Sequence, residues 1–260
     1  MQGRETGMII GCMATYPARA QLFWTSVKTI LTQVDMLHIV LNEFAAIPDI
    51  PEVPANVRFI IPDRDLKDVG KFLPKVDEDD LVFLADDDIL FPPDYVQRSV
   101  AAMAGFPSDR RCVFGYHGTR YLPATFQGDV SSAIGAIKHK IHGGKLRKLR
   151  TSFFYENALD APRAVDQLGS GVAMARGRDI PPFSFMNGSQ NFVDVRWARW
   201  CFENNVDRVC LPREGSWIQT QSTESSIYQS FTRRTPVHVR NEIYGFAGRW
   251  KDQTLPLVSP

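Results

Sequence analysis

Three consecutive aspartates, Asp86, Asp87 and Asp88, come directly after a short apolar run at residues 81–85. Neighbouring carboxylates repel one another unless positive charge lies beside them, and a hard divalent cation is the simplest source of that charge. Mg²⁺ or Mn²⁺ takes one or two protein carboxylates and fills its remaining positions with water and phosphate oxygens. The alternative is that the acids only precede the helix that begins after the Pro-Pro pair at 92–93. Because a helix start needs a single capping side chain, the triplet favours a metal site.

Asp194 is a further acid, apart from these three, whose position suggests a catalytic role. If a helix runs from Asp194, positions 197, 198, 201 and 202 share its face, and all four residues there are apolar or small. A carboxylate at the head of such a buried stripe would point along the sheet toward the cleft, which suits a general base. The alternative is an acid that only complements the helix dipole.

The elements that must position these acids can be predicted from periodicity. Apolar runs predict strands at 8–14, 36–41, 57–61 and 81–85, and apolar residues between 18 and 34 follow a helical period. Alternating strands and helices predict an α/β fold with a parallel sheet and helices on both faces. Such sheets bind ligands beyond the carboxyl ends of their strands, where the three aspartates lie.

The second half of the chain is less regular. Its patterns predict a helical turn at 71–76 ahead of the acids, a helix at 95–104, strands at 111–116 and 207–211, and a glycine turn at 169–171 that leads into a strand. Between residues 123 and 164 lies a long polar tract whose stretch 138–150 is basic. We expect either a solvated surface or a flap that meets an anionic glycan, a lipid phosphate or a membrane.

Residues 215–234 form a Ser/Thr/Gln-rich segment that ends in Arg233 and Arg234. It predicts either a lid whose arginines reach a diphosphate or a plain surface loop.

Composition is that of an ordinary soluble protein. The 260 residues are 44% hydrophobic and 23% charged, with a net charge of +1. We therefore expect one catalytic domain over 1–260, with a nucleotide-sugar half at 1–105 and an acceptor half at 106–260. Cys12, Cys112, Cys201 and Cys210 show no CxxC spacing, which predicts buried, reduced thiols and no zinc site. Residues 1–7 are polar and no apolar run reaches membrane-spanning length, so we expect cytoplasmic residence. We also expect no nucleic-acid partner.

The chain resembles the GT-A glycosyltransferases, in particular bacterial inverting enzymes grouped around glycosyltransferase family 2. The resemblance is carried by the three aspartates, the Gly-Ser-Gly strand at 169–175, the later Asp194 and the segment Asp68-Val69-Gly70-Lys71. It implies a Rossmann-like, mixed and mainly parallel sheet flanked by helices. It also implies metal-dependent transfer, with inversion, of a sugar from a nucleotide-diphosphate donor, by default a UDP-sugar. The acceptor would be a glycan or a lipid-linked glycan in surface polysaccharide synthesis, with peripheral contact to the inner membrane through 138–150.

The resemblance also implies roles for individual residues. Asp86 and Asp88 would form the DxD pair, with Asp86 turned toward the nucleotide ribose or the metal and Asp88 binding the Mn²⁺ or Mg²⁺ ion. Asp87 would share either task, and Asp194 would be the catalytic base. His238 would complete the coordination shell of the metal. The alternative is a histidine with a purely structural role. The residues that would bind the nucleotide donor, besides Asp86 and Asp87, are Thr15, Tyr16, Pro17, Arg19, Asn42, Asp68, Lys71, Arg233 and Arg234. A surface salt bridge is the alternative for Asp68 and Lys71.

Two other functions remain open. A sugar-phosphate nucleotidyltransferase also uses carboxylate-held Mg²⁺ on a parallel sheet, although residues 14–19 make a poor version of its phosphate loop. A non-catalytic module that binds a polyanion through residues 138–150 would explain that tract but would leave the aspartates without a purpose.

Overall fold

The computed structural model describes residues 7–50, 52–107, 109–121, 150–221 and 235–248. Its centre is an eight-stranded sheet in the order β3-β2-β1-β4-β11-β6-β12-β9. These strands are β1 (Ile9–Thr15), β2 (Met36–Leu41), β3 (Val57–Ile60), β4 (Leu81–Asp86), β6 (Cys112–Gly115), β9 (Arg163–Ala164), β11 (Val172–Arg176) and β12 (Asp207–Cys210).

Most pairings in the sheet are parallel, as the βα alternation predicts. Strands β3, β2, β1 and β4 run in one direction, and β12 is parallel to β6. Strand β11 is antiparallel to both β4 and β6, and β9 is antiparallel to β12. The prediction of a mixed, mainly parallel α/β sheet is therefore confirmed, and β4 lies between a parallel and an antiparallel neighbour.

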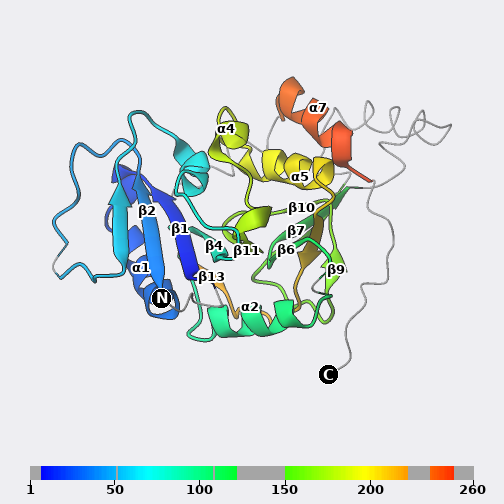
Figure 1. Ribbon diagram of the computed structural model, residues 1–260, viewed down its shortest axis with the longest axis horizontal. Coiled ribbons are helices and arrows are strands. Elements are labelled where there is room, and N and C mark those ends of the chain that lie inside the picture. The colour runs from blue at the N-terminus through cyan, green and yellow to red at the C-terminus, as the bar shows by residue number, and fades with distance from the viewer. Residues whose placement is uncertain (1–6, 51, 108, 122–149, 222–234, 249–260) are drawn as a thin grey trace, which may run out of the picture.

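Helices cover both faces of this sheet (Figure 1). One face carries α1 (Phe23–Ile30) and α2 (Tyr95–Ala104), and the other carries α4 (Phe183–Met186) and α5 (Val193–Glu203). Because successive strand residues face opposite sides, Phe83 packs under α2 against Tyr95, whereas Leu84 belongs to the core under Trp197 of α5. Helix α7 (Val237–Phe246) packs on the outside of α5.

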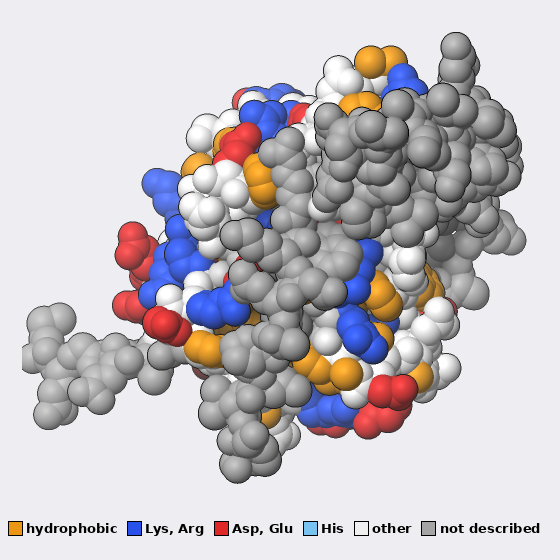
Figure 2. Space-filling model, turned by 90° about the vertical axis from the view of Figure 1, so that its right-hand side faces the viewer, with side chains coloured by type: hydrophobic (Ala, Val, Ile, Leu, Met, Phe, Trp, Pro, Cys, Tyr) orange, Lys and Arg blue, Asp and Glu red, His pale blue; other side chains and the backbone are white. Residues whose placement is uncertain are grey.

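Short elements connect this framework. Two small sheets are formed by β10 (Gln167–Leu168), β7 (Gly118–Tyr121) and β8 (Arg150–Phe153), and by β13 (Gln219–Thr220) with β5 (Ile89–Leu90). The 3₁₀ turns within the described ranges are η1 (Pro17–Arg19), η2 (Leu31–Gln33), η3 (Lys67–Phe72) and η6 (Gly177–Asp179). In Figure 2, the described residues of this face carry interspersed acidic, basic and hydrophobic side chains.

Several predicted elements need correction. The apolar stripe at 18–34 does not form one helix, because η1 and η2 flank the shorter α1. The turn expected at 71–76 is η3, which begins and ends earlier. Within the expected loop at 123–164, the described part contains β8 and β9, because their backbones pair with β7 and β12. All four cysteines are buried and free, as expected. In the described ranges, no helix is long and apolar enough to span a membrane.

Candidate functional site

The three aspartates lie at the carboxyl edge of β4, near the middle of the main sheet. Asp86 is the last residue of β4, and its backbone N–H donates to the Gly171 carbonyl at 3.1 Å. The side chains of Asp86 and Asp88 are 44% and 19% exposed, whereas that of Asp87 is 7% exposed. Asp86 and Asp88 are therefore the two acids that a solvent-borne ligand could reach, which favours them as the working pair.

Arg19 supplies positive charge to two of these acids. It follows β1 in η1, and its Nη1 forms an ion pair with Asp87 Oδ1 and lies 2.9 Å from Asp88 Oδ2. Burial raises the pKa of Asp88 to about 6, with the charge of Asp86 adding to the rise and Arg19 opposing it. Burial also raises the pKa of Asp87, and Arg19 again opposes this.

Lys71 supplies charge to the third acid. Its Nζ donates to Asp86 Oδ1 at 2.5 Å and to the carbonyl and hydroxyl oxygens of Ser170, each at 3.2 Å. Burial lowers the pKa of this ammonium, but the charge and hydrogen bond of Asp86, together with the charges of Asp194 and Asp68, raise it, and the net shift is upward. Lys71 is therefore a buried cation.

These contacts correct the physical premise of the metal prediction. The sequence argument took a divalent cation as the simplest source of positive charge beside the three acids, but Arg19 and Lys71 supply such charge from within the protein. Among the described residues, no group of three or more His, Cys, Asp or Glu side chains is arranged to hold a metal ion. Metal binding itself stays a prediction.

The carboxylates still fit a hard cation of the magnesium type. Lys71 contacts Oδ1 of Asp86 and Arg19 contacts Oδ2 of Asp88, so the second oxygen of each carboxylate lies outside these ion pairs. Oδ2 of Asp87 is buried and has no hydrogen-bond partner among the residues described. Since Mg²⁺ is often held by one or two carboxylates with water and phosphate, Asp86 and Asp88 would suffice.

Asp194 lies beside this cluster. It is in the first turn of α5, as predicted, and its Oδ1 accepts the backbone N–H of Ser170 at 2.8 Å. The carboxylate thus bonds to the turn before β11 instead of serving only the helix dipole. Burial raises the pKa of Asp194, and the charge of Lys71 and the hydrogen bonds of Ser170 counteract that rise.

Asp68 and Asn42 support the loop that carries Lys71. Asp68 Oδ1 accepts the backbone N–H of Asn191 at 2.9 Å, and burial raises the pKa of Asp68 to about 6. Asn42 accepts from the Leu66 N–H and donates to the Lys67 carbonyl, both at 3.0 Å. Both polar atoms of the Asn42 side chain are therefore used within the protein, which favours a supporting role over the expected contact with the nucleotide.

The segment after β1 lies next to the acids. Thr15 is buried, Tyr16 is partly exposed and Pro17 is exposed. The Arg19 guanidinium lies 5.6 Å from the centre of the Tyr16 ring. Tyr16 and Pro17 are thus the residues of this segment that remain accessible to a donor, whereas Arg19 is engaged by the acids.

Of the remaining predicted site residues, His238 and Arg150 are within the described part of the chain. His238 is exposed near the start of α7, with its ring centre 5.3 Å from that of Phe192. Its metal role stays a prediction. Arg233, Arg234 and residues 138–149 of the basic tract lie outside the described residues, and Arg150 begins β8.

Sequence reasoning missed the function of the Gly-Ser-Gly turn. Ser170 bonds to both Lys71 and Asp194, and a Cβ at Gly171 would lie 2.1 Å from Asp86 Oδ2. The available signal was a pair of glycines around a serine immediately before a strand.

A second omission is His117, which follows β6 at the same edge of the sheet. Its ring centre lies 5.3 Å from that of Phe154 and 6.0 Å from that of Tyr155. Burial lowers the pKa of His117 to about 4, as do the charges of Arg150 and Arg213, whereas Asp86 raises it. The imidazole is therefore neutral near physiological pH and adds no charge to the acid cluster.

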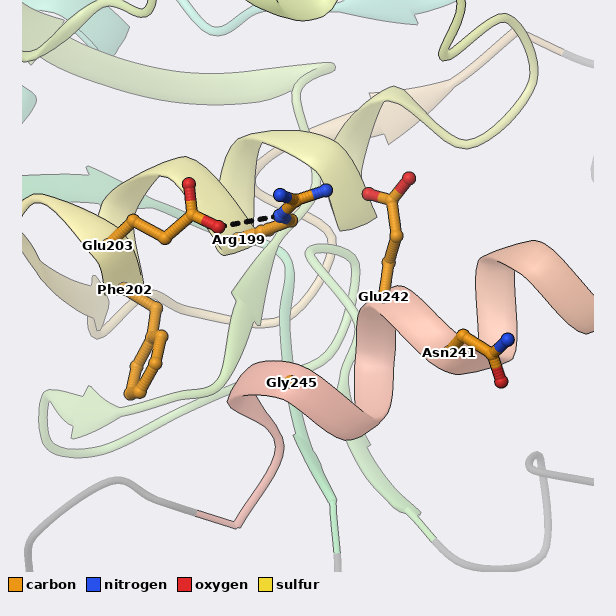
Figure 3. Close-up of a pocket in the computed structure, with 6 residues that line it drawn as sticks. All are labelled: Arg199, Phe202, Glu203, Asn241, Glu242 and Gly245. Carbon is orange, nitrogen blue, oxygen red and sulfur yellow. Dashed lines mark hydrogen bonds and ion pairs between the residues drawn. The ribbon is translucent and has the colours of Figure 1, made fainter.

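A surface hollow of about 350 Å³ lies elsewhere, between α5 and α7 (Figure 3). Its lining includes Phe202, Asn241 and Gly245. The charged side chains there are engaged, since Arg199 pairs with Glu203 at 2.7 Å and Glu242 pairs with Arg196 at 2.7 Å. The hollow contains none of the predicted site residues.

Comparison with known proteins gives little similarity. No protein-family model matches the chain, and no curated protein matches it. Among solved structures, the crystal structure of mannose-6-phosphate isomerase from Helicobacter pylori is similar over 84% of this chain and 95% of that chain. The sequence identity is 14% and the TM-score is 0.35. At that level, neither fold nor activity is transferred to this chain.

Proposed function

We propose that this protein is a metal-dependent glycosyltransferase with a GT-A fold, which transfers a sugar with inversion from a nucleotide-diphosphate donor to a glycan or lipid-linked acceptor. UDP is the expected nucleotide, and surface polysaccharide synthesis is the expected setting. The proposal is supported most directly by the connection between Asp86, an accessible acid at the end of β4, and Asp194 on α5. That connection runs through Lys71 and Ser170.

Donor binding would fall to the acids of β4. Asp86 and Asp88 would hold Mn²⁺ or Mg²⁺, which when bound supplies Lewis-acid stabilisation to the departing nucleotide diphosphate. Arg19 keeps Asp88 in place through its ion pair, and Lys71 keeps Asp86 in place. These fixed cations also limit the net negative charge that a diphosphate would meet at this edge of the sheet.

Asp194 would act as the general base. Its Oδ1 accepts the Ser170 N–H, and Oδ2 would take the proton from an acceptor hydroxyl. The acceptor oxygen then bonds to the anomeric carbon, and the bond from that carbon to the diphosphate oxygen breaks with its electron pair going to the diphosphate. A single displacement by an acceptor on the opposite face gives inversion.

Ligand screening followed by a transfer assay tests this function. Thermal unfolding would be measured with UDP-, GDP- and CMP-sugars, each with and without Mn²⁺, because a ligand that binds only the folded state raises the unfolding temperature. We expect one class of donor to raise it in the presence of Mn²⁺ and to serve in transfer. Release of pyrophosphate from a nucleoside triphosphate and a sugar phosphate would instead identify a nucleotidyltransferase and contradict the proposal.

A further inference from the structure

We propose that Lys71 and Ser170 form a positioning bridge that fixes Asp194 relative to Asp86. The bridge would hold the donor-binding acids of β4 and the proton-accepting Asp194 in a fixed position relative to each other. The inference rests on the proposed function, because that function gives Asp86 and Asp194 their roles.

Ser170 is the centre of the bridge because it uses its polar atoms in two directions. Its carbonyl and hydroxyl oxygens both accept from Lys71 Nζ at 3.2 Å, and its backbone N–H donates to Asp194 Oδ1 at 2.8 Å. Lys71 is in η3, Ser170 precedes β11 and Asp194 is in α5. The bridge thus joins three elements that are far apart in the sequence.

Lys71 acts through its neighbours and not by contact with a ligand. An ammonium has three N–H donors, and Asp86 Oδ1 and the two oxygens of Ser170 account for all three. The Lys71 side chain is 3% exposed, whereas that of Asp86 is 44% exposed. The buried end of the bridge therefore supports an acid that reaches solvent. This arrangement favours a supporting role for Lys71 over the expected contact with the donor.

Lys71 is also linked electrostatically to both proposed functional acids. The charges of Asp86, Asp194 and Asp68 all act on its ammonium, with Asp86 the strongest of the three. A purely local salt bridge would require only one of these carboxylates. Asp86 and Asp194 thus share one cation, and the hydrogen bonds of Ser170 join that cation to Asp194.

A double-mutant cycle tests the Ser170 half of the bridge. Ser170→Ala removes the hydroxyl that accepts from Lys71 and also interacts with the Asp194 carboxylate. Because loss of a supporting contact typically costs this much, we expect kcat to fall roughly 10- to 100-fold. The KM for the donor should change by less than about threefold, because Lys71 still holds Asp86. In an Asp194→Asn background, Ser170→Ala should have no further effect. An equal fold-loss in both backgrounds would overturn the positioning role.

The Lys71 half is tested by binding. Lys71→Met should weaken calorimetric binding of UDP with Mn²⁺ roughly 10- to 100-fold, whereas Ser170→Ala should leave this binding unchanged. Lys75→Met, at an exposed lysine, is the matched control and should leave both binding and turnover unchanged. Undiminished UDP binding by a folded Lys71→Met protein would overturn this half.

Folding and function are separated by two further readings. If thermal unfolding shows that the Lys71→Met protein is not folded, the Ser170 double-mutant cycle alone decides the inference. If the wild-type protein transfers no sugar from any donor, the proposed function is contradicted and the bridge falls with it. If the wild type is active but the effects of Ser170→Ala and Asp194→Asn on turnover are additive, the bridge is contradicted and the proposed function is not.

Discussion

Gly171, which directly precedes β11, lies opposite Asp86, the last residue of β4. Because Gly171 has no side chain, there is room for the Asp86 carboxylate. The Gly171 carbonyl accepts the Asp86 N–H at 3.1 Å. A Cβ at position 171 would lie 2.1 Å from Asp86 Oδ2 and 2.5 Å from Asp86 Cγ. No ordinary contact is that short, so any larger residue must displace Asp86 or the strand.

Gly171→Ala should therefore disturb the site. Displacing Asp86 breaks its contact with Lys71, so we expect UDP binding with Mn²⁺ to weaken roughly 10- to 100-fold by calorimetry. Gly245→Ala in α7 is the matched control, because a Cβ there meets nothing within 4 Å. It should leave binding unchanged and stabilise the protein by about 0.5–1 kcal/mol. Equal binding by both variants would refute this account of Gly171.

Arg19→Met should destabilise the fold. The change leaves Asp87, which is 7% exposed, without its cation, and removing one partner of a buried ion pair costs about 3–5 kcal/mol. Urea denaturation would measure the free energy of unfolding, and a second change, Asp87→Asn, should recover part of the loss. Arg64→Met breaks an exposed pair with Asp63 and should change stability by less than about 1 kcal/mol. Equal effects of Arg19→Met and Arg64→Met would show that Arg19 does not compensate a buried charge.

Asp194→Asn should lower turnover without loss of nucleotide binding. The amide cannot accept a proton, so kcat should fall about 10²- to 10⁴-fold. Because burial raises the pKa of Asp194, wild-type turnover should also fall on the acid side of its pH profile as the carboxylate is protonated, and this limb should be absent from the variant. Asp63→Asn, at an exposed acid, is the control. Wild-type turnover in Asp194→Asn would remove Asp194 from the base role.

Asp166 should make stability depend on pH. It accepts the backbone N–H groups of Tyr121 and Gly248, at 2.7 and 2.9 Å, yet burial raises its pKa from 3.8 to about 6. The folded state therefore binds this proton more tightly than the unfolded state. The resulting stability is present at low pH and is lost as the pH rises through about 6.

Comparison of wild type with Asp166→Asn isolates this effect. The stability of the wild type relative to the variant should increase as the pH is lowered from about 7 to about 5, as measured by thermal unfolding. Asp109→Asn, at an exposed acid, is the matched control. A difference for Asp166→Asn that stays constant or shrinks at low pH would contradict the assignment.

Local patterns were enough to predict the framework of the fold. The apolar run at 36–41 matches β2, and the Pro-Pro pair followed by a helical period matches α2 at Tyr95–Ala104. The same patterns placed the aspartates at the end of β4 and Asp194 in the first turn of α5.

The partners of those acids could not be predicted in the same way. Arg19 and Asp87 are 68 residues apart, and Lys71 and Ser170 are 99 residues apart. Periodicity within a window carries no information about such pairs, so the sequence could not indicate that Arg19 and Lys71 lie beside the acids. The stripe expected at 18–34 begins in η1, and Arg19 contacts the acids from there.

Calorimetric titration of UDP into the wild-type protein and into Asp88→Ala, each with and without Mn²⁺, tests the central claim most directly. The account predicts that the wild type binds UDP only when Mn²⁺ is present and that a folded Asp88→Ala protein does not bind it. Binding that is indifferent to Mn²⁺, or that persists undiminished in Asp88→Ala, would contradict the assignment of a metal and a donor diphosphate to the acids of β4.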